Sequence, residues 1–343
     1  MEKVALVTGN EGFVGAWVSL YLMRRGFKVY GLDNRTSLGD RLSDAIDLRS
    51  MIDKQFECDV CDFSQVKEIV ETVKPNIIFN LAGQAIVPRA FKEPLETFRT
   101  NTLGTLTMLE VARQTQIPKA VICITSDKVY ENNEQIWPYR ESDPLGGKDI
   151  YSVSKSSAEL VSRAFAKTHL ADLSINVQTV RLGNVVGGGD WSKNRLIPDI
   201  MSSIPEGGKF YVRYPHATRP FQHVLDVADG IFKIGTAALK GTIVSGEGWN
   251  LGPRNNTYAR VSEVIARCEE NWPFLKIEQN PEPIAEDIHL SVEIAKFKSV
   301  FGAPQFTSQE ALDFTIRWYR GFFDNRNSKE LVEDDFKYFE GKQ

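Results

Sequence analysis

The chain has 343 residues, a net charge of −4 and 25% charged residues, all ordinary values for a globular protein. Such a length forms one large α/β domain or a domain with a smaller lobe. The acidic balance argues against general nucleic-acid binding, and no apolar run is long enough to span a membrane. No secretory signal is recognisable, so we expect a cytoplasmic protein.

Two of the four cysteines have the spacing of a metal or redox pair. Cys58 and Cys61 are separated by two residues, but no second pair or nearby His completes a metal site. Cys123 lies in an apolar run that is typical of a buried strand. We therefore predict plain thiols and no metal.

The first half of the chain alternates strand-like apolar runs with amphipathic segments. We predict strands at Val4–Thr8, Lys28–Leu32, Phe56–Val60, Asn76–Leu81, Ala120–Thr125 and Val177–Leu182. Helices are expected between them at Gly12–Arg25, Phe63–Val73, Pro94–Gln114 and Ser152–Thr168. Repeated βα units with short connections predict a Rossmann-type α/β fold, a doubly wound parallel sheet covered on both faces.

The pattern loosens after about residue 183 into Gly-rich and Pro-rich loops. Shorter helices are predicted there at Leu196–Ser203, Val224–Leu239, Val261–Glu270 and Gln309–Phe323. We therefore divide the chain into a nucleotide-binding domain, residues 1–182, and a smaller C-terminal α/β lobe, residues 183–343. The chain could cross back between the two, and a substrate cleft is expected between them.

The first predicted strand leads into a glycine-rich turn, Gly9-Asn-Glu-Gly-Phe-Val-Gly15, that opens a helix. Such glycines permit a tight turn and close approach of the backbone to a pyrophosphate, and the helix N-terminus offers free N–H groups. The spacing is Gly-x-x-Gly-x-x-Gly rather than Gly-x-Gly-x-x-Gly. The alternative is a glycine-rich turn without a ligand, but the strand–turn–helix context favours a dinucleotide.

Asp33 ends the second predicted strand, where a carboxylate accepts hydrogen bonds from an adenosine ribose and repels the extra phosphate of NADP. We therefore predict NAD, although Arg35 could cradle that phosphate and Asp33 could be a turn residue only. The predicted cofactor contacts are Gly9, Glu11, Gly12, Phe13, Val14, Gly15, Asp33, Asn34, Asp59, Val60, Leu81, Ala82, Gly83, Gln84, Asn101, Tyr151 and Lys155.

Tyr151 and Lys155 are four residues apart, so on a helix they lie on one face, one turn apart. The ammonium would favour the phenolate and make the Tyr a usable base near neutral pH. Upstream, Ser126, Asp127 and Lys128 follow a predicted buried strand. The alternatives are a surface turn for the Asp–Lys pair and an ordinary exposed helix face for the Tyr–Lys pair.

Together these motifs resemble the extended short-chain dehydrogenase/reductase superfamily and, within it, the nucleotide-sugar 4,6-dehydratases. The resemblance covers roughly residues 3–255 and is similar to the form found in CDP-glucose 4,6-dehydratases. It is carried by Thr125-Ser-Asp-Lys-Val-Tyr-Glu-Asn132, Tyr139-Arg-Glu-Ser-Asp-Pro-Leu-Gly-Gly147, Arg181-Leu-Gly-Asn-Val-Val-Gly-Gly-Gly-Asp-Trp191, Asn194-Arg-Leu-Ile-Pro-Asp199 and Pro215-His-Ala-Thr-Arg-Pro-Phe-Gln-His223.

The resemblance implies a three-step conversion of a nucleotide-diphospho-hexose, with CDP-glucose as the expected substrate. Tyr151 would remove the proton of the sugar 4-hydroxyl, which Ser126 hydrogen-bonds, as hydride moves from C4 to NAD. The 4-ketone acidifies the C5 proton, a base removes it, and Asp127 protonates the departing C6 hydroxyl. NADH then returns hydride to C6, which gives a 4-keto-6-deoxy sugar.

Lys128 stands where many other 4,6-dehydratases carry a Glu as the C5 base. A Lys can act as a base only if its pKa falls, through burial or through nearby positive charge. The nicotinamide ring of NAD and Lys155 could supply that charge, so we predict the base role. Stabilisation of the enolate or an ion pair with Asp127 is the alternative.

Four residues are predicted to contact the substrate, namely Asn184, Arg195, Arg219 and His223. The two Arg side chains carry forked cations that match the oxygens of a diphosphate, with a surface salt bridge as the alternative for each. His223 is expected to be a hydrogen-bonding residue rather than a catalyst. Trp191 could equally pack against the ligand or against the lobe.

Two other functions fit the same scaffold. A nucleotide-sugar 4-epimerase needs NAD, Ser126, Tyr151 and Lys155 but no acid at C6 or base at C5, so Asp127 and Lys128 favour dehydration. A non-catalytic NAD-binding protein commonly loses the Tyr or the Lys, and this chain keeps both. The resemblance also implies a homodimer through the helices at about residues 94–114 and 152–168, and a role in deoxysugar and polysaccharide biosynthesis.

Overall fold

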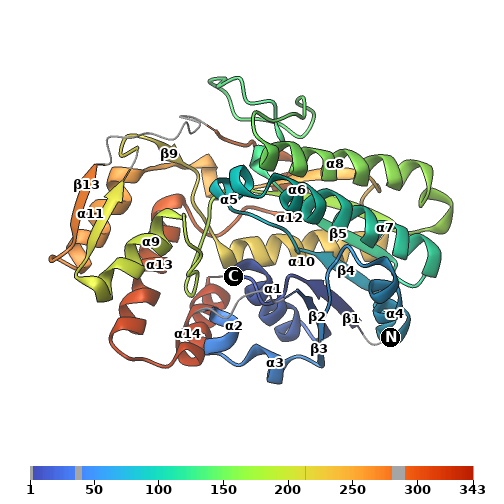
Figure 1. Cartoon of the computed structure of the whole chain (residues 1–343), viewed down its shortest axis with the longest axis horizontal. Helices are drawn as coiled ribbons and strands as arrows, with labels where there is room; N and C mark the ends of the chain where they lie inside the picture. The colour runs from blue at the N-terminus through green and yellow to red at the C-terminus, as the bar shows by residue number, and fades with distance from the viewer. Residues whose placement is uncertain (1–2, 35–40, 213, 280–289, 343) are drawn as a thin grey trace.

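The computed structural model describes residues 3–34, 41–212, 214–279 and 290–342, with a sheet at the centre (Figure 1). Seven parallel strands form this sheet in the order β11-β6-β5-β4-β1-β2-β3. The strands are β1 (Lys3–Thr8), β2 (Phe27–Asp33), β3 (Lys54–Glu57), β4 (Ile77–Asn80), β5 (Ala120–Ser126), β6 (Asn176–Leu182) and β11 (Glu247–Leu251). This sheet confirms the predicted Rossmann-type fold.

Helices cover both faces of the sheet and build much of the C-terminal lobe. They are α1 (Phe13–Arg24), α2 (Leu42–Ala45), α3 (Leu48–Met51), α4 (Phe63–Val73), α5 (Val87–Lys92), α6 (Pro94–Phe98), α7 (Gly104–Thr115), α8 (Ile150–Thr168), α9 (Leu196–Ser203), α10 (Val224–Lys240), α11 (Val261–Asn271), α12 (Ala295–Phe301), α13 (Ser308–Phe323) and α14 (Ser328–Gly341). Short strands pair beside the main sheet: β7 (Val185–Val186) with β10 (Gln222–His223), β9 (Thr218–Arg219) with β12 (Ala259–Arg260), and β8 (Lys209–Val212) with β13 (Lys276–Gln279).

The two faces of the sheet bury separate apolar cores because side chains alternate along a strand. Ala5 and Val7 of β1 belong to the core that includes α1, α10 and the C-terminal helices. Leu6, between them, belongs to the core that includes α4 and α7. In Figure 1 the C-terminal helices α13 and α14 lie on the left and α4 and α7 lie on the right. The sheet is therefore covered on both faces, as a parallel sheet requires.

The strand order reverses at β1, with β2 on one side and β4 on the other, and the loops that follow β1 and β4 meet there. The Thr8 hydroxyl donates to the Asn80 side-chain oxygen at 2.7 Å and accepts from the Ala82 amide at 3.1 Å. In open α/β sheets, ligands bind at such a point, outside the carboxyl ends of the strands. The fold therefore places its crevice beside the glycine-rich turn.

Two predicted elements differ from the structure. The third strand ends at Glu57 rather than Val60, because the Asp59 carboxylate accepts from the Cys61 amide at 2.9 Å and turns the chain. The long helix predicted over Pro94–Gln114 is interrupted by a π-helical turn at Arg99–Leu103 that separates α6 from α7. Such turns often occur at functional sites.

The C-terminal part of the chain contributes to the main sheet as well as to the lobe. Strand β11, which we did not predict, pairs with β6, and α10 packs against α1, β5 and β6. The chain thus crosses back from the lobe into the nucleotide-binding domain. Helix α14, also not predicted, packs its Phe336 against Trp17 of α1, with ring centroids 5.6 Å apart.

Gly188 provides a test of how tightly the lobe closes on the sheet. Its carbonyl accepts from the Trp17 indole at 3.0 Å, and an added Cβ would lie 2.2 Å from the buried Trp318 ring. We expect Gly188→Ala to lower the free energy of unfolding by about 1–3 kcal/mol, because neither ring can move freely. Gly341→Ala, where a Cβ meets open space, is the control. Equal unfolding midpoints for the two variants would contradict this packing.

Candidate functional site

Tyr151 and Lys155 lie in the first turns of α8, directly beside the end of β5. The helix begins where the Asp149 carboxylate accepts from the Ser152 amide at 3.0 Å and from its hydroxyl at 2.7 Å. Asp149 is therefore the N-cap of α8. This cap fixes the turn that carries Tyr151, which is only 7% exposed.

Ser126 and Asp127 form a hydrogen-bonded turn at the end of β5. The Ser126 hydroxyl donates to the Asp127 carboxylate at 3.0 Å and accepts from the Lys128 amide at 3.2 Å. Ser126 also hydrogen-bonds Tyr151, which links the turn to α8. The structure therefore brings the predicted Ser–Asp–Lys and Tyr–Lys motifs together, and both Ser126 and Asp127 are buried.

The pKa of the Tyr151 phenol is raised. Burial raises its pKa, and the negative charge of Asp127 raises it further. The hydrogen bond with Ser126 and the positive charges of Arg195 and Lys128 oppose this rise without cancelling it. The expected net shift toward phenolate is therefore not seen, because burial outweighs the cations.

Lys155 is the second buried titratable group on this face of α8. Its ammonium donates to the Ile124 carbonyl at 3.2 Å and lies 3.0 Å from where a Cβ on Gly83 would be. Burial lowers the pKa of Lys155 to about 8. Lys155 is thus held between the end of β5 and the loop after β4.

Asp127 has the opposite perturbation, which suits a proton donor. Burial raises the pKa of its carboxyl, while the charges of Lys128 and Arg219 and the hydrogen bond from Ser126 oppose that rise. The carboxyl therefore keeps its proton to a higher pH than an exposed Asp does. General acids in enzymes are commonly tuned in this way.

The glycine-rich turn fits a dinucleotide. Gly9 has φ of +67°, and a Cβ there would lie 2.8 Å from the Ala82 amide nitrogen. A Cβ on Gly15 would lie 2.0 Å from the Gly9 carbonyl oxygen. The Asp33 carboxylate accepts from the Glu11 amide at 3.3 Å, which brings the predicted ribose-binding group to the same turn. Arg35, the rival argument for NADP, lies outside the described residues.

Several predicted cofactor contacts already have protein partners in the structure. The Glu11 carboxylate pairs with Arg49, a partner that its sequence position did not suggest. Asp59 pairs with Arg99 at 2.7 Å. Asn101, in the π-helical turn, exchanges two hydrogen bonds with the backbone of Gln84 and donates to the Ser154 hydroxyl at 2.9 Å. These side chains therefore shape the walls of the crevice.

The remaining predicted cofactor contacts line the same strand ends and loops. Phe13 and Val14 open α1, Asn34 is exposed after β2, and Leu81, Ala82 and Gly83 follow β4. Val60 is buried against the backbone at Gly104. Their contacts with NAD stay predictions.

Two of the predicted substrate residues direct positive charge at the catalytic groups. Arg195, which pairs with Asp190 at 3.4 Å, acts on Tyr151, and Arg219 acts on Asp127. Asn184 lies at the end of β6, where its carbonyl accepts from the Gln222 amide at 3.0 Å. The loops of the lobe therefore reach the same place as β5 and α8.

His223 has a structural role that its sequence position did not indicate. Its ring is 0% exposed, caps α10 by accepting from the Leu225 amide at 3.3 Å, and packs between Phe306 and Phe314. Burial and the charge of Arg317 lower its pKa to about 3, so the ring is neutral. Its Nε2 is buried without a hydrogen-bond partner among the described residues, and its predicted contact with a substrate stays a prediction.

The sequence left open whether Trp191 packs against the ligand or against the lobe. In the structure it packs within the lobe. Its ring lies 5.2 Å from that of Tyr319 and 5.1 Å from that of Phe322, centroid to centroid. These contacts anchor the Gly-rich loop before it to α13.

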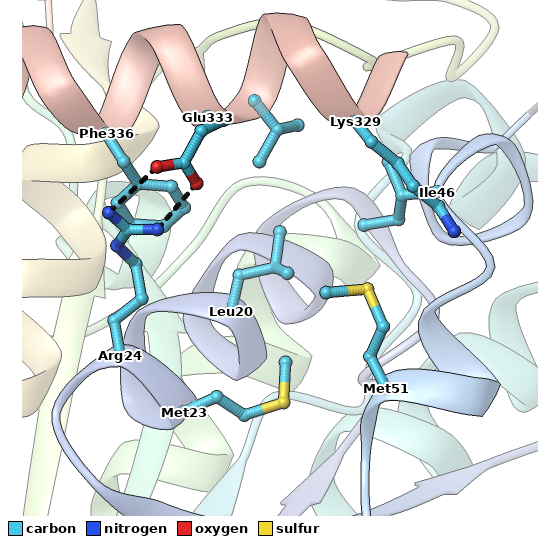
Figure 2. A pocket seen from close by; sticks show the side chains of 9 residues that line it. Leu20, Met23, Arg24, Ile46, Met51, Lys329, Glu333 and Phe336 are labelled. Atoms are coloured by element: carbon cyan, nitrogen blue, oxygen red, sulfur yellow. Dashed lines mark hydrogen bonds and ion pairs between the residues drawn. The ribbon is translucent and has the colours of Figure 1, made fainter. Parts of the chain in front are cut away.

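One hollow lies away from these groups, between α1 and α14 (Figure 2). It encloses about 410 Å³ and is lined by Leu20, Met23, Arg24, Ile46, Met51, Lys329, Val332, Glu333 and Phe336. None of the predicted site residues lines it. In the part of the chain that the structure describes, no cluster of metal-ligating side chains is found, and no helix has the length and apolarity to cross a membrane.

Residues 5–252 match the NAD dependent epimerase/dehydratase family. The chain belongs to that family. A CDP-glucose 4,6-dehydratase of Salmonella typhimurium is 34% identical over 93% of this chain and 91% of its own length. A dTDP-glucose 4,6-dehydratase of Xanthomonas campestris is 26% identical over 92% of each chain.

Solved structures of the family share the fold. The dTDP-glucose 4,6-dehydratase of Bacillus anthracis, in complex with NAD, has a TM-score of 0.79 at 21% identity and covers 96% of this chain and 99% of its own. The UDP-glucose 4-epimerase of Thermotoga maritima, with UDP-glucose, has a TM-score of 0.81 at 22% identity and covers 93% of this chain and 99% of its own. The likeness confirms the fold, and the family match supports the predicted NAD cofactor; which residues hold NAD stays a prediction.

The lowered pKa of Lys155 predicts that removal of this side chain raises the stability of the protein while it abolishes activity. The unfolded chain binds this proton more tightly, with a pKa of 10.5 against about 8, so folding is disfavoured below pH 8 and recovers as pH rises toward 10.5. We expect Lys155→Met to abolish turnover and to stabilise the protein by up to about 3 kcal/mol at pH 7, with a smaller gain at pH 10.

Urea unfolding at the two pH values measures this difference. Lys167→Met, at an exposed position of the same helix, is the control and should show no pH-dependent gain. A Lys155→Met protein that is less stable than wild type at both pH values would contradict the assignment.

Proposed function

We propose that the protein is a nucleotide-sugar 4,6-dehydratase that converts CDP-glucose to CDP-4-keto-6-deoxyglucose with bound NAD. The observation that carries this proposal is the buried Asp127, with a raised pKa, hydrogen-bonded to Ser126 beside Tyr151. A 4-epimerase needs no proton donor beyond the Tyr, so a second tuned acid in the same turn supports dehydration. The similarity to a CDP-glucose 4,6-dehydratase supports it further.

The oxidation half of the reaction belongs to α8 and the end of β5. When bound, NAD supplies the hydride chemistry at C4 and C6 of the sugar. Ser126 holds the 4-hydroxyl, and Tyr151 takes its proton. The cations of Lys128 and Arg195 favour the phenolate that this step requires, since both lower the pKa of Tyr151. The Lys155 ammonium lies beside Gly83, which supports its proposed contact with the cofactor.

The elimination half belongs to Asp127 and Lys128. Asp127 gives its proton to the departing C6 hydroxyl, and its raised pKa keeps that proton available. Lys128 follows it directly in the short turn Asp127–Val129 and is only partly exposed. We assign Lys128 the removal of the C5 proton because it directly follows the acid Asp127, and the step requires its amine in the neutral form.

The substrate assignment rests on similarity and on charge. The CDP-glucose relative is more similar to this chain than the dTDP-glucose relatives are. Arg195 and Arg219 supply forked cations for the diphosphate, at the place where the lobe meets the catalytic groups. Asn184 lies between β6 and β7, where its carbonyl accepts from the Gln222 amide.

The proposal predicts a defined product. Wild-type protein with NAD and CDP-glucose should form a 4-keto-6-deoxy sugar, detected by the ultraviolet absorbance that such sugars develop in alkali. Asp127→Asn should lower product formation roughly 100-fold to 10,000-fold, because the proton donor at C6 is lost. Tyr151 can still take the 4-hydroxyl proton in this variant, so reduced nicotinamide should accumulate in a single turnover.

Two controls separate the rival functions. Asp172→Asn, at an exposed turn remote from the site, should behave as wild type. Tyr151→Phe should form neither product nor reduced nicotinamide. A wild-type protein that interconverts C4 epimers without a 4-keto-6-deoxy product would show an epimerase. One that binds NAD and turns over no nucleotide sugar would show a non-catalytic protein.

We further propose a homodimer formed through α5, α6, the π-helical turn and α8, which pack against one another. This face exposes large apolar side chains, with Leu95 at 81% and Phe91 at 63%, and with Phe98, Leu103 and Leu160 beside them in the same elements. An apolar patch of this kind on a globular protein is typical of an interface. The patch coincides with the helices that the family resemblance implied.

The dimer can be tested by substituting charged residues at the centre of the proposed interface. We expect wild type to elute as a dimer and the double variant Leu95→Glu, Leu160→Glu to elute as a monomer in size-exclusion chromatography with light scattering, because two carboxylates per subunit would be buried unpaired. Val300→Glu, at an exposed apolar residue of α12, should leave the dimer intact. A monomeric wild type, or a dimeric double variant, would contradict the interface.

We also propose that the reaction serves deoxysugar formation for polysaccharides in the cytoplasm. All four cysteines are free thiols, which fits a reducing compartment.

A further inference from the structure

Gln222 carries a buried amide nitrogen without a hydrogen-bond partner among the described residues. It lies on the short strand β10, where its backbone N–H donates to the Asn184 carbonyl at 3.0 Å. Its side chain is 1% exposed, yet its Nε2 has no acceptor. An unsatisfied buried donor is unfavourable, and native structures seldom keep one without a reason. The amide is therefore placed for an acceptor that comes from outside the chain.

This amide lies beside Gly183, which directly follows β6. A Cβ on Gly183 would lie 3.6 Å from Gln222 Nε2 and 3.1 Å from Asp127 Oδ2. The two side chains thus converge on one small space that only a glycine leaves open. The Gln222 Nε2 makes no hydrogen bond with the Asp127 carboxyl. One oxygen atom entering this space could accept from Gln222 and face Asp127.

We propose that Gln222 binds the C6 oxygen of the hexose and holds it beside Asp127. This inference rests on the proposed function, in which Asp127 protonates that oxygen. A hydroxyl oxygen has two lone pairs, so it can take a hydrogen bond from the amide while it takes the proton from the carboxyl. A neutral amide does this without adding charge next to Asp127, whose proton is needed for the step.

The step then balances as an elimination. A base takes the C5 proton, and the C5–H electron pair forms the C5–C6 double bond. The C6–O bond breaks with its pair on oxygen, which takes the proton of Asp127 and departs as water. Throughout, the amide of Gln222 donates to this oxygen, where negative charge develops, so its contribution is stronger in the transition state than in the ground state.

A binding comparison between two nucleotide sugars tests the contact without turnover. In the NAD-bound Tyr151→Phe background, affinities for CDP-glucose and for CDP-6-deoxyglucose, which lacks the C6 oxygen, are measured by titration calorimetry. We expect the protein with intact Gln222 to bind CDP-glucose about 5-fold to 10-fold more tightly. Adding Gln222→Met should weaken CDP-glucose binding by a similar factor and leave the 6-deoxy sugar within about twofold.

Thr236→Val is the matched control, because the Thr236 hydroxyl is also buried and unpartnered but lies on α10 outside the site. It should change neither affinity. Equal losses for both sugars with Gln222→Met, or no loss for either, would overturn the contact. If the Met variant fails to fold, Gln222→Leu replaces it. The contact can also be tested without any variant at this position, because equal affinity of the Gln222-intact protein for the two sugars would overturn it.

The comparison also separates this inference from the proposed function. A protein that shows the oxygen-dependent loss but whose wild type makes no 4-keto-6-deoxy product would retain the contact and contradict the dehydratase. A protein that makes the product but shows no oxygen-dependent loss would retain the dehydratase and contradict the contact.

Discussion

The site depends on the removal of ionisable groups from water at the carboxyl edge of the sheet. Tyr151, Lys155 and Asp127 are all buried, and burial is the largest influence on the pKa of each. The same physical cause shifts all three pKa values, in favour of the acid role of Asp127 and against the base role of Tyr151. It keeps the proton on the Asp carboxyl and on the phenol, and it weakens the hold of Lys155 on its own proton. A solvated version of this cluster would lose that tuning.

Burial of these groups costs free energy, and hydrogen bonds from the surrounding fold offset part of that cost. Ser126 gives Asp127 a hydrogen bond at 3.0 Å, and the Ile124 carbonyl gives Lys155 an acceptor at 3.2 Å. Both come from β5, a central strand whose neighbours on either side are parallel strands. The groups are therefore held by a part of the sheet that has little freedom to relax around them, which is what a preorganised site requires.

The sequence was sufficient where local pattern decides the structure. Helix α4 spans the predicted Phe63–Val73, because an Asp cap and an amphipathic period fix both of its ends locally. The sequence failed where distant parts of the chain decide. Strand β11 is short and contains Gly248 and Asn250, and it becomes a strand by pairing with β6. The rings of Phe306 and Phe314 that bury His223 come from a distant part of the chain, so no local pattern indicated this burial.

The same contrast between local pattern and distant contacts applies to the site residues. The spacing of Tyr151 and Lys155 predicted one helix face, but the sign of the pKa shift of the Tyr depends on burial that no spacing reveals. The route of the chain explains what the spacing could not. It leaves the sheet at Gly183, passes through the loops that carry Arg195 and Arg219, and returns through Gln222 to α10 and β11. Cations of the lobe therefore act on groups of the sheet. An anionic diphosphate bound to Arg219 would neutralise its charge, which opposes the effect of burial on Asp127, and would raise the pKa of Asp127 further when substrate is present.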